Sequence, residues 1–322
     1  MHRYAESAHA NAYGCTFAAE RIIPVTAPPA LGSRVSLRYR SGAAEHTDVI
    51  GHLEAVVPSW RIRTKSDGII DVDPADIVSA REISYKPVRT SEIRALEQAA
   101  ALAWPGVEQQ WLDGWLLRAG HGVTSRANSA VPLDVSADLR ALPGIVDWYR
   151  SRGLAPWLAL PERLLAVRTP GVKQTRVLVA DGSTGAPAGE VTLAAAPDAD
   201  WLAVHQRDVP PDVLCSVVDG DVVFASVPGV AVGRGAVTTA PDGTRWLGIA
   251  AVRVAPEFRR QGYARQVCAA LRAWGAEQGA ARVYVQVLSD NDGANSLYAS
   301  MGFQLHHQGR YVEAGELLPP TI

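Results

Sequence analysis

The stretch VRVAPEFRRQGYARQVCAALRAW, residues 252–274, constrains the fold more than any other part of the chain. Its apolar start has the pattern of a strand, and the strand must stop at Pro256 because proline has no backbone N–H to donate. Apolar residues then recur with the spacing of one helix face, at Val267, Ala270, Leu271 and Trp274. A strand that turns directly into an amphipathic helix is typical of a mixed α/β sheet.

The turn between this strand and the helix has the composition of an anion site. The first turn of a helix carries unpaired N–H groups and a partial positive charge, so it binds an anion without any side chain. Gly262 lets the backbone approach closely, and Arg259 and Arg260 add positive charge. We expect a pyrophosphate here, held by Arg259, Arg260, Gln261, Gly262, Tyr263, Ala264 and Arg265. The alternative is an exposed basic helix start that contains a glycine.

Two further features extend this site. Before Pro256, an extended ligand can pair with the backbone of Val252 and Val254 as an added strand. The later segment NDGANSLYASMGF, residues 291–303, predicts a helix with Ala294, Leu297, Tyr298 and Met301 on one face. Tyr298 is then either a packed core aromatic or a phenol whose O–H points at a leaving group.

Together these motifs resemble the GNAT superfamily of acyl-CoA-dependent N-acyltransferases. The family's R/Q-x-x-G-x-G/A loop matches Arg259–Ala264, and its N-x-x-A-x-x-L-Y-x-x-x-G-F segment matches Asn291–Phe303. The resemblance implies an N-acetyltransferase that moves acetyl from acetyl-CoA to an unidentified amine by direct attack. It also implies roles for individual residues. The backbone of Val252, Arg253 and Val254 would bind the pantetheine arm, Asn291 would lie beside the cofactor, and Tyr298 would protonate the CoA thiolate as general acid.

The sequence departs from the family at the general base. Many members carry a carboxylate on the strand before the phosphate loop, but here that strand reads WLGIAAVRV. The nearest candidates by order are Glu257, Glu190, His306 and His307, and each is expected at the surface. A water-relayed base or an already neutral amine is an open alternative. A catalytically silent acyl-CoA sensor, with the N-terminal barrel as its partner-binding module, is therefore the second hypothesis for the function.

The chain has 322 residues, which suggests more than one domain. Residues 1–28 are Ala-rich and are expected to be a disordered tail. Five short β-branched runs in residues 29–88 predict a small all-β barrel that resembles SH3-like domains. A linker helix is expected over 89–106, with Ile93, Leu96, Ala100 and Ala103 on one face.

The remainder of the chain reads as two related α/β halves. Residues 147–161, DWYRSRGLAPWLALP, align without a gap with residues 273–287, AWGAEQGAARVYVQV. We interpret 107–186 as a degenerate GNAT-like half that binds no CoA, and 187–322 as the catalytic GNAT domain, closed by a terminal hairpin. The glycine-rich GVAVGRGAV resembles a nucleotide loop, but a hairpin is favoured because no helix follows it.

Composition excludes several function classes. The formal net charge of −2 makes nucleic acid an unlikely partner, although a protein could bind through the barrel. No apolar run approaches the length of a membrane span, and the three scattered cysteines indicate a reduced, cytoplasmic protein. His306-His307 lacks metal-ligand spacing, so no metal is expected. The acceptor itself cannot be read from these residues.

Overall fold

The computed structural model of the chain describes residues 28–42, 45–182 and 190–318. The chain divides into two compact units, which separate between Ile83 and Ser84. The expected N-terminal tail lies, except for residue 28, outside the described residues.

The first unit is a small antiparallel sheet with the strand order β4-β3-β2-β1-β5. Side chains alternate between the two faces of a strand, and this places Val35, Leu37, Leu53 and Ile62 in its core with no exposed surface. The five runs expected from the sequence all form strands: β1 Arg34–Arg40, β2 His46–Ala55, β3 Trp60–Thr64, β4 Ile69–Val72 and β5 Ile77–Glu82.

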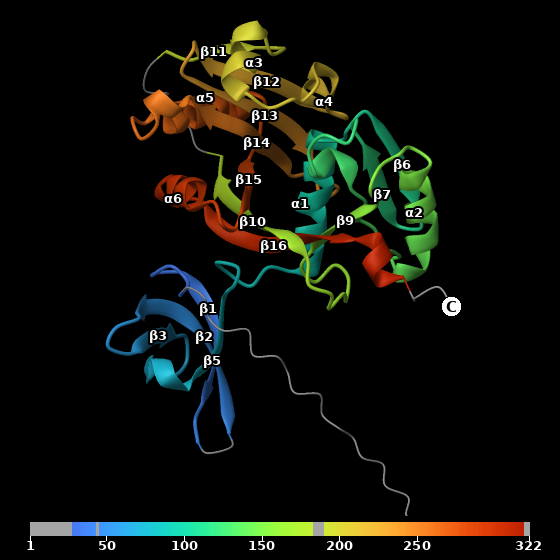
Figure 1. Ribbon diagram of the computed structural model, residues 1–322. Coiled ribbons are helices and arrows are strands. Elements are labelled where there is room, and N and C mark those ends of the chain that lie inside the picture. The colour runs from blue at the N-terminus through green and yellow to red at the C-terminus, as the bar shows by residue number, and fades with distance from the viewer. Residues whose placement is uncertain (1–27, 43–44, 183–189, 319–322) are drawn as a thin grey trace, which may run out of the picture. The chain divides into compact units, whose positions relative to one another are not determined.

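The second unit is built on an eight-stranded mixed sheet with the order β11-β12-β13-β14-β15-β10-β16-β9 (Figure 1). Neighbours in it are antiparallel except β14 and β15, which are parallel and joined by helix α5, Tyr263–Glu277. This confirms the mixed α/β class. The strands are β9 Trp157–Pro161, β10 Val172–Asp181, β11 Thr192–Ala194, β12 Asp221–Val227, β13 Ala231–Thr239, β14 Arg245–Val254, β15 Arg282–Leu288 and β16 Gln304–Glu313. Strands β12 and β13 form the hairpin expected at GVAVGRGAV.

Strand β10 changes the expected organisation of this unit. It comes from the segment interpreted as the first half, yet it lies between β15 and β16 and pairs with both. The terminal hairpin was therefore a wrong expectation: β16 is a single strand, and its partners are β10 and β9 from earlier in the chain. The boundary expected between residues 186 and 187 lies outside the described residues, and one sheet extends across it.

Helix α1, Thr90–Ala103, is part of this unit's core and not only a connector. Its residues Leu96, Ala99 and Ala100 pack with Trp246 of β14 and Tyr284 of β15. The next residues along those strands, Leu247 and Val285, pack instead with α5. Because neighbouring side chains on a strand point to opposite faces, α1 and α5 cover opposite sides of the sheet.

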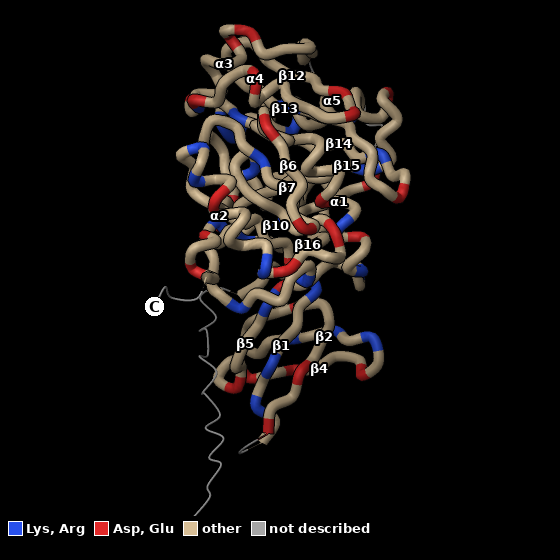
Figure 2. The backbone as a smooth tube through the Cα atoms, turned by 90° about the vertical axis from the view of Figure 1, so that its right-hand side faces the viewer, with Lys and Arg blue, Asp and Glu red and all other residues tan. Residues whose placement is uncertain are grey.

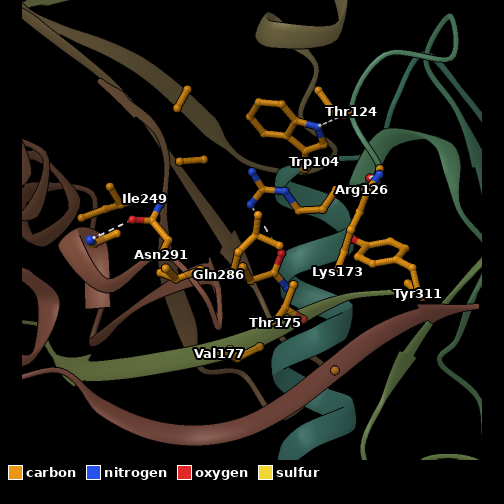
Figure 3. A pocket seen from close by; sticks show the side chains of 18 of the residues that line it. Trp104, Thr124, Arg126, Lys173, Thr175, Val177, Ile249, Gln286, Asn291 and Tyr311 are labelled. Atoms are coloured by element: carbon orange, nitrogen blue, oxygen red, sulfur yellow. Dashed lines mark hydrogen bonds between the residues drawn. The ribbon is translucent and has the colours of Figure 1, made fainter. Parts of the chain in front are cut away.

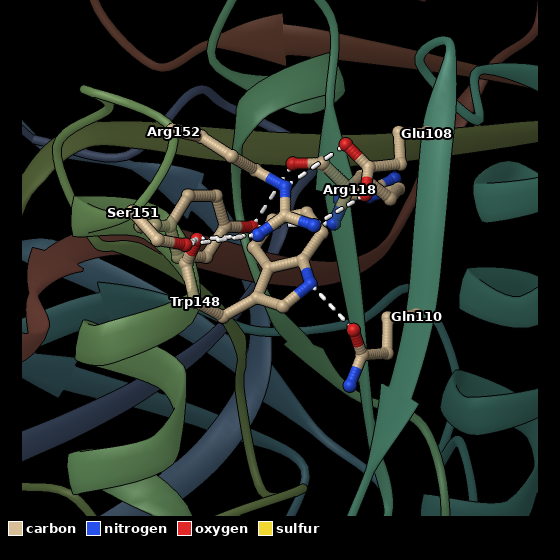
Figure 4. A network of polar contacts seen from close by, with 7 residues as sticks. Glu108, Gln110, Arg118, Trp148, Ser151 and Arg152 are labelled. Carbon is tan, nitrogen blue, oxygen red and sulfur yellow. Dashed lines mark hydrogen bonds and ion pairs between the residues drawn. The ribbon is translucent and has the colours of Figure 1, made fainter.

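A smaller three-stranded sheet lies beside α1, formed by β6 Glu108–Leu112, β7 Trp115–Ala119 and β8 Val131–Pro132. Helix α2, Leu142–Arg150, follows it and carries Pro143 in its first turn. Figure 4 shows the polar contacts between the C-terminal end of α2 and β6. Arg152 forms an ion pair with Glu108. The guanidinium carbon of Arg152 also lies 3.9 Å from the centroid of the Trp148 ring. Trp148 Nε1 donates to Gln110 Oε1 at 2.6 Å. The remaining helices are α3 Ala199–His205, α4 Pro211–Cys215 and α6 Asp292–Ser300.

Candidate active site

Strands β14 and β15 separate partway along their length. Their parallel pairing runs from Trp246 to Ile249, whereas β14 continues to Val254 and β15 to Leu288. Ala251 has a φ of +54°, which is unusual for a non-glycine residue within a strand. It lies where the register between β13 and β14 shifts, the mark of a β-bulge that redirects the strand. A cavity of about 460 Å³ opens between the two strands, a size suited to a small ligand.

The predicted phosphate loop lies at the N-terminus of α5. Gly262 is the residue that precedes the first helical turn, with a φ of +93°, a conformation that glycine adopts without strain. A Cβ atom built on Gly262 would meet nothing within 4 Å, so the loop faces open space. Arg259 and Arg260 are exposed beside it, and the first turn carries no acidic residue. The backbone therefore has the form expected of an anion site.

The other loop residues have partners within the protein. Gln261 Nε2 donates to Glu257 O at 3.2 Å, and Arg265 donates to Ser300 Oγ of α6 at 2.6 Å. Tyr263 packs edge-to-face against Phe258. Ala264 is half-buried at the start of the helix. The loop from 259 to 265 lies outside the cavity lining.

The cavity lining includes four of the sequence-predicted site residues: Val252, Arg253, Asn291 and Tyr298. Asn291 caps α6, since its Oδ1 accepts from Ala294 N at 3.1 Å (Figure 3). Tyr298 is 6% exposed and shares a hydrogen bond with the thiol of Cys268. Burial raises the pKa of the Tyr298 phenol well above its ordinary value, so it keeps its proton at neutral pH.

The expectation that His306 and His307 lie at the surface is wrong. His306 is 2% exposed and His307 is fully buried, because β16 is an interior strand of the sheet. His307 Nε2 lies 3.0 Å from Oε1 of Glu97 on α1, and both side chains line the cavity. Glu97 also accepts from Gln286 Nε2 at 3.3 Å. Glu190 and Glu257, the other two base candidates, are exposed and outside the lining.

The two buried histidines are in direct contact with each other. Their Nδ1 atoms lie 2.8 Å apart, and burial lowers the pKa of His306 to about 3, so His306 is neutral. Neutral His306 can donate from Nδ1 to His307 Nδ1, and Nε2 of His307 in turn contacts the Glu97 side chain. The chain of contacts thus ends at a carboxylate that faces the cavity.

Glu97 was not among the base candidates predicted from the sequence. The signal was present in helix α1, where Glu97 follows Leu96 and comes four residues after Ile93, inside a run of buried residues. A carboxylate on the buried face of a helix requires a partner. That partner, His307, is 210 residues away in the chain.

The charges around the cavity are unevenly distributed. Among the described residues that line the cavity, Glu97 is the one carboxylate. The basic residues of the lining are Arg126, Lys173, Arg207, Arg253 and Arg310. Figure 2 shows Lys and Arg positions interspersed with Asp and Glu positions along the backbone of the second unit. The positive character is therefore a local property of the cavity.

Comparison with known proteins identifies the family. A family model described as "Probable histone acetyltransferase Rv0428c C-terminal" matches residues 90–312. The chain is 51% identical over 293 residues to the "Probable histone acetyltransferase Rv0428c" of Mycobacterium tuberculosis, covering 89% of this chain and 96% of that protein. The chain belongs to this family of GNAT-type acetyltransferases.

More distant proteins agree with this assignment. The acetyltransferase is 27% identical over 251 residues to the "Uncharacterized N-acetyltransferase YobR" of Bacillus subtilis, covering 66% of this chain and 94% of that protein. A "GCN5-related N-acetyltransferase from Kribbella flavida" has the same fold, with a TM-score of 0.51 and 17% identity over 71% of this chain and 96% of that chain.

The comparisons refine the expectation for the first unit. Residues 29–81 match a model described as the Rv0428c N-terminal Sm-like domain. The barrel is thus Sm-like where an SH3-like domain was expected. Strand number and alternation define a small β-domain of this kind, but they do not separate one such family from another.

Neither a metal site nor a membrane span is found within residues 28–42, 45–182 and 190–318. No group of three or more His, Cys, Asp or Glu side chains there is placed to hold a metal ion. No helix in those ranges is long and apolar enough to cross a bilayer.

Proposed function

We propose that this acetyltransferase transfers the acetyl group of acetyl-CoA to a primary amine that binds in the cavity between β14 and β15. The observation that carries the proposal is the divergence of these strands beyond Ile249, with Tyr298 on the cavity wall and Gly262 at the start of α5. An extended pantetheine arm fits beside β14 as an added strand. The pyrophosphate then meets the free N–H groups near Gly262, while Arg259 and Arg260 offset its charge.

The leaving group and the carbonyl each have a partner in this arrangement. Tyr298, held neutral by burial, donates its proton to the departing CoA thiolate. Backbone N–H groups of β14 beyond the bulge at Ala251 polarise the thioester carbonyl. Asn291 holds the first turn of α6 and thereby helps to position Tyr298 on the same helix.

We further propose Glu97 as the general base, oriented by His307. The carboxylate faces the cavity, receives the His307 Nε2–H bond and lies within the same hydrogen-bond chain as His306. An ammonium group that enters the cavity meets Glu97 as the one acidic lining residue in the described ranges. Transfer of its proton to Glu97 leaves the neutral amine that attack on the thioester requires.

Release of CoA on addition of an amine tests the proposal. Purified protein with acetyl-CoA is screened against amino acids, polyamines, aminoglycosides and a lysine-rich peptide, with binding of acetyl-CoA measured separately by calorimetry. Turnover with any acceptor supports the enzyme. Tight acetyl-CoA binding without CoA release across the panel supports the sensor hypothesis instead and contradicts the proposal.

We also propose that residues 107–186 include a degenerate copy of the catalytic fold. The connection of strand, helix and parallel strand occurs as β14–α5–β15 and again as β8–α2–β9, where Ala130 and Leu158 form a parallel bridge. Gly153 and Gly279 both have positive φ at the helix end of their copy. The β8–α2 turn has no counterpart of the Arg259–Ala264 loop, so this copy would bind no CoA.

A further inference from the structure

The loop between β7 and β8, residues 120–130, is held by many internal hydrogen bonds, although none of its residues has a role in the proposed acetyl transfer. The buried side chain of Asn128 holds it together. Asn128 Oδ1 accepts from Gly120 N at 2.8 Å and Gly122 N at 2.9 Å, and Asn128 Nδ2 donates to Val123 O at 2.5 Å and Thr124 O at 2.9 Å. An amide that satisfies this many backbone groups fixes one conformation of the loop.

The same loop stores backbone strain at the cavity. Thr124 has a φ of +62°, a costly conformation for a β-branched residue. Its hydroxyl contacts Trp104 Nε1 and Ala127 N, each at 3.3 Å. The residues that follow the strained position, Ser125 and Arg126, line the cavity. Such strain persists where the surrounding structure holds a side chain in a required place.

The side chain so placed is Arg126. Its guanidinium carbon lies 4.9 Å from the centroid of the Trp104 ring, and its Nη1 donates to Gln286 Oε1 at 3.4 Å. Figure 3 shows it beside Gln286 and below Trp104, in the cavity. Glu97, the one carboxylate among the described residues that line the cavity, is linked to Arg126 through the side chain of Gln286. Several N–H donors of a fixed guanidinium therefore remain for a ligand.

Neighbouring charges reinforce this arrangement. Lys173 Nζ donates to Ser125 Oγ at 2.7 Å and stands at the edge of the same cavity. Arg234 lies 4.5 Å from the Trp104 ring centroid and is fully buried among backbone carbonyls. The side chain of Gln286 lies between Arg126 and Glu97: its Oε1 accepts from Arg126, and its Nε2 donates to the Glu97 carboxylate. The cavity thus offers one acidic position for an ammonium group and a basic position for an anion.

We propose that Arg126, assisted by Lys173, binds a carboxylate of the acceptor, so that the acceptor is a small amine that also carries a carboxylate. This inference rests on the proposed acetyl transfer and adds the class of its second substrate. A planar guanidinium offers a parallel pair of N–H donors, which matches a planar carboxylate. A lysine-rich peptide, in contrast, would bring further positive charge to a basic wall.

The test compares acceptors that carry a carboxylate with acceptors that lack one. Rates of CoA release are measured for amino acids, for the corresponding amino-acid amides, for phosphoethanolamine and for a lysine-rich peptide. We expect kcat/KM to be about ten- to a hundredfold higher for at least one acid than for its amide, the loss typical of one charge-assisted hydrogen-bond pair. Arg126→Gln should remove this preference, Arg126→Lys should restore part of it, and both should keep the acetyl-CoA affinity. Arg150→Gln, at an exposed arginine of α2, serves as the control.

Several outcomes would overturn the inference. One is that every amide, phosphoethanolamine or the peptide is acetylated as fast as, or faster than, the amino acids. This result would contradict the inference and still support acetyl transfer as the function. If no amine releases CoA, the proposed function fails, and the same matched pairs are titrated into the CoA-bound protein. Binding that depends neither on the carboxylate nor on Arg126 then contradicts the inference too. If Arg126→Gln does not fold, the rates of the wild-type protein with amino acids and with their amides still test whether a carboxylate is preferred.

Discussion

Nε2 of His307 lies 3.0 Å from Oε1 of Glu97, across 210 residues of sequence. This contact joins helix α1 to strand β16 at the wall of the cavity. It also supplies a carboxylate to the cavity, whereas the strand before the predicted phosphate loop has none. The contact depends on β10, which separates β15 from β16 and so sets the position of His307 under α1.

Glu97→Gln should lower kcat by roughly 10²–10⁴-fold, because the amide keeps the shape of the side chain but cannot take a proton from the amine. The affinity for acetyl-CoA should not change, since the proposed arrangement places Glu97 at the acceptor end of the cavity. Stopped-flow kinetics with a saturating acceptor and calorimetry with acetyl-CoA provide the two readouts. Glu277→Gln, at an exposed carboxylate near the end of α5, is the matched control. Wild-type kcat in Glu97→Gln would remove Glu97 from the base role.

Tyr298→Phe should also lower kcat by roughly 10²–10⁴-fold if the phenol protonates the thiolate. The ring would still pack against Phe303, at a centroid distance of 5.3 Å, so the thermal midpoint should change little. Since burial holds the pKa of Tyr298 well above its ordinary value, its loss of a proton should not limit the wild-type rate at or below pH 10. Cys268→Ala, which removes only the hydroxyl's thiol partner, should keep most of the activity. An unchanged kcat in Tyr298→Phe would show that water protonates the leaving group.

Gly262→Asp and Gly262→Asn form a pair of equal size that isolates charge at the phosphate loop. Either side chain enters open space, because a Cβ atom there has no neighbour within 4 Å. Asparagine tolerates positive φ, so Gly262→Asn should lose little affinity. The aspartate should weaken acetyl-CoA binding at least tenfold relative to asparagine, because its charge repels the pyrophosphate. Equal affinities by calorimetry would show that the pyrophosphate binds elsewhere.

Acid should destabilise the second unit through two buried histidines. Burial lowers the pKa of His306 to about 3 and that of His205 to about 4, from an ordinary value of 6.5. Below pH 6.5 these two histidines become protonated in the unfolded chain but stay neutral in the folded protein. The free energy of unfolding therefore falls as the pH drops from 6.5 toward 4. The slope should approach roughly 1.4 kcal/mol per pH unit for each histidine, and neither should contribute above pH 7.

Urea unfolding between pH 4.5 and 7.5, followed by tryptophan fluorescence, measures this slope. His306→Asn keeps a nitrogen near the position of Nδ1 and removes one titrating ring, so its slope should be about half that of the wild type. His46→Asn changes an exposed histidine of the first unit and should follow the wild type. Parallel curves for wild type and His306→Asn would show that His306 does not resist protonation in the folded protein.

Much of the local structure was predictable because it depends on residues that are close in sequence. Pro256 ends its run of strand residues, and the spacing of Val267 and Leu271 specifies the helix that follows. The alternation within residues 34–82 likewise predicts each strand of the first unit. The register between strands could not be obtained this way. The position of β10 beside β15 depends on long-range packing, and no nearby residue encodes it.

The candidate phosphate loop, the α6 motif with Tyr298 and hence the family could be read from the chain alone, because each of these is a contiguous pattern of residues with a fixed spacing. The burial of His306 and His307, the reach of Glu97 into the cavity from a helix expected to be a linker, and the position of Arg126 in the cavity wall became visible only in the folded chain. These side chains are far apart along the chain. A sheet that takes β10 between β15 and β16 brings together side chains from α1, the β7–β8 loop and β16, and such contacts leave no periodic trace in the sequence.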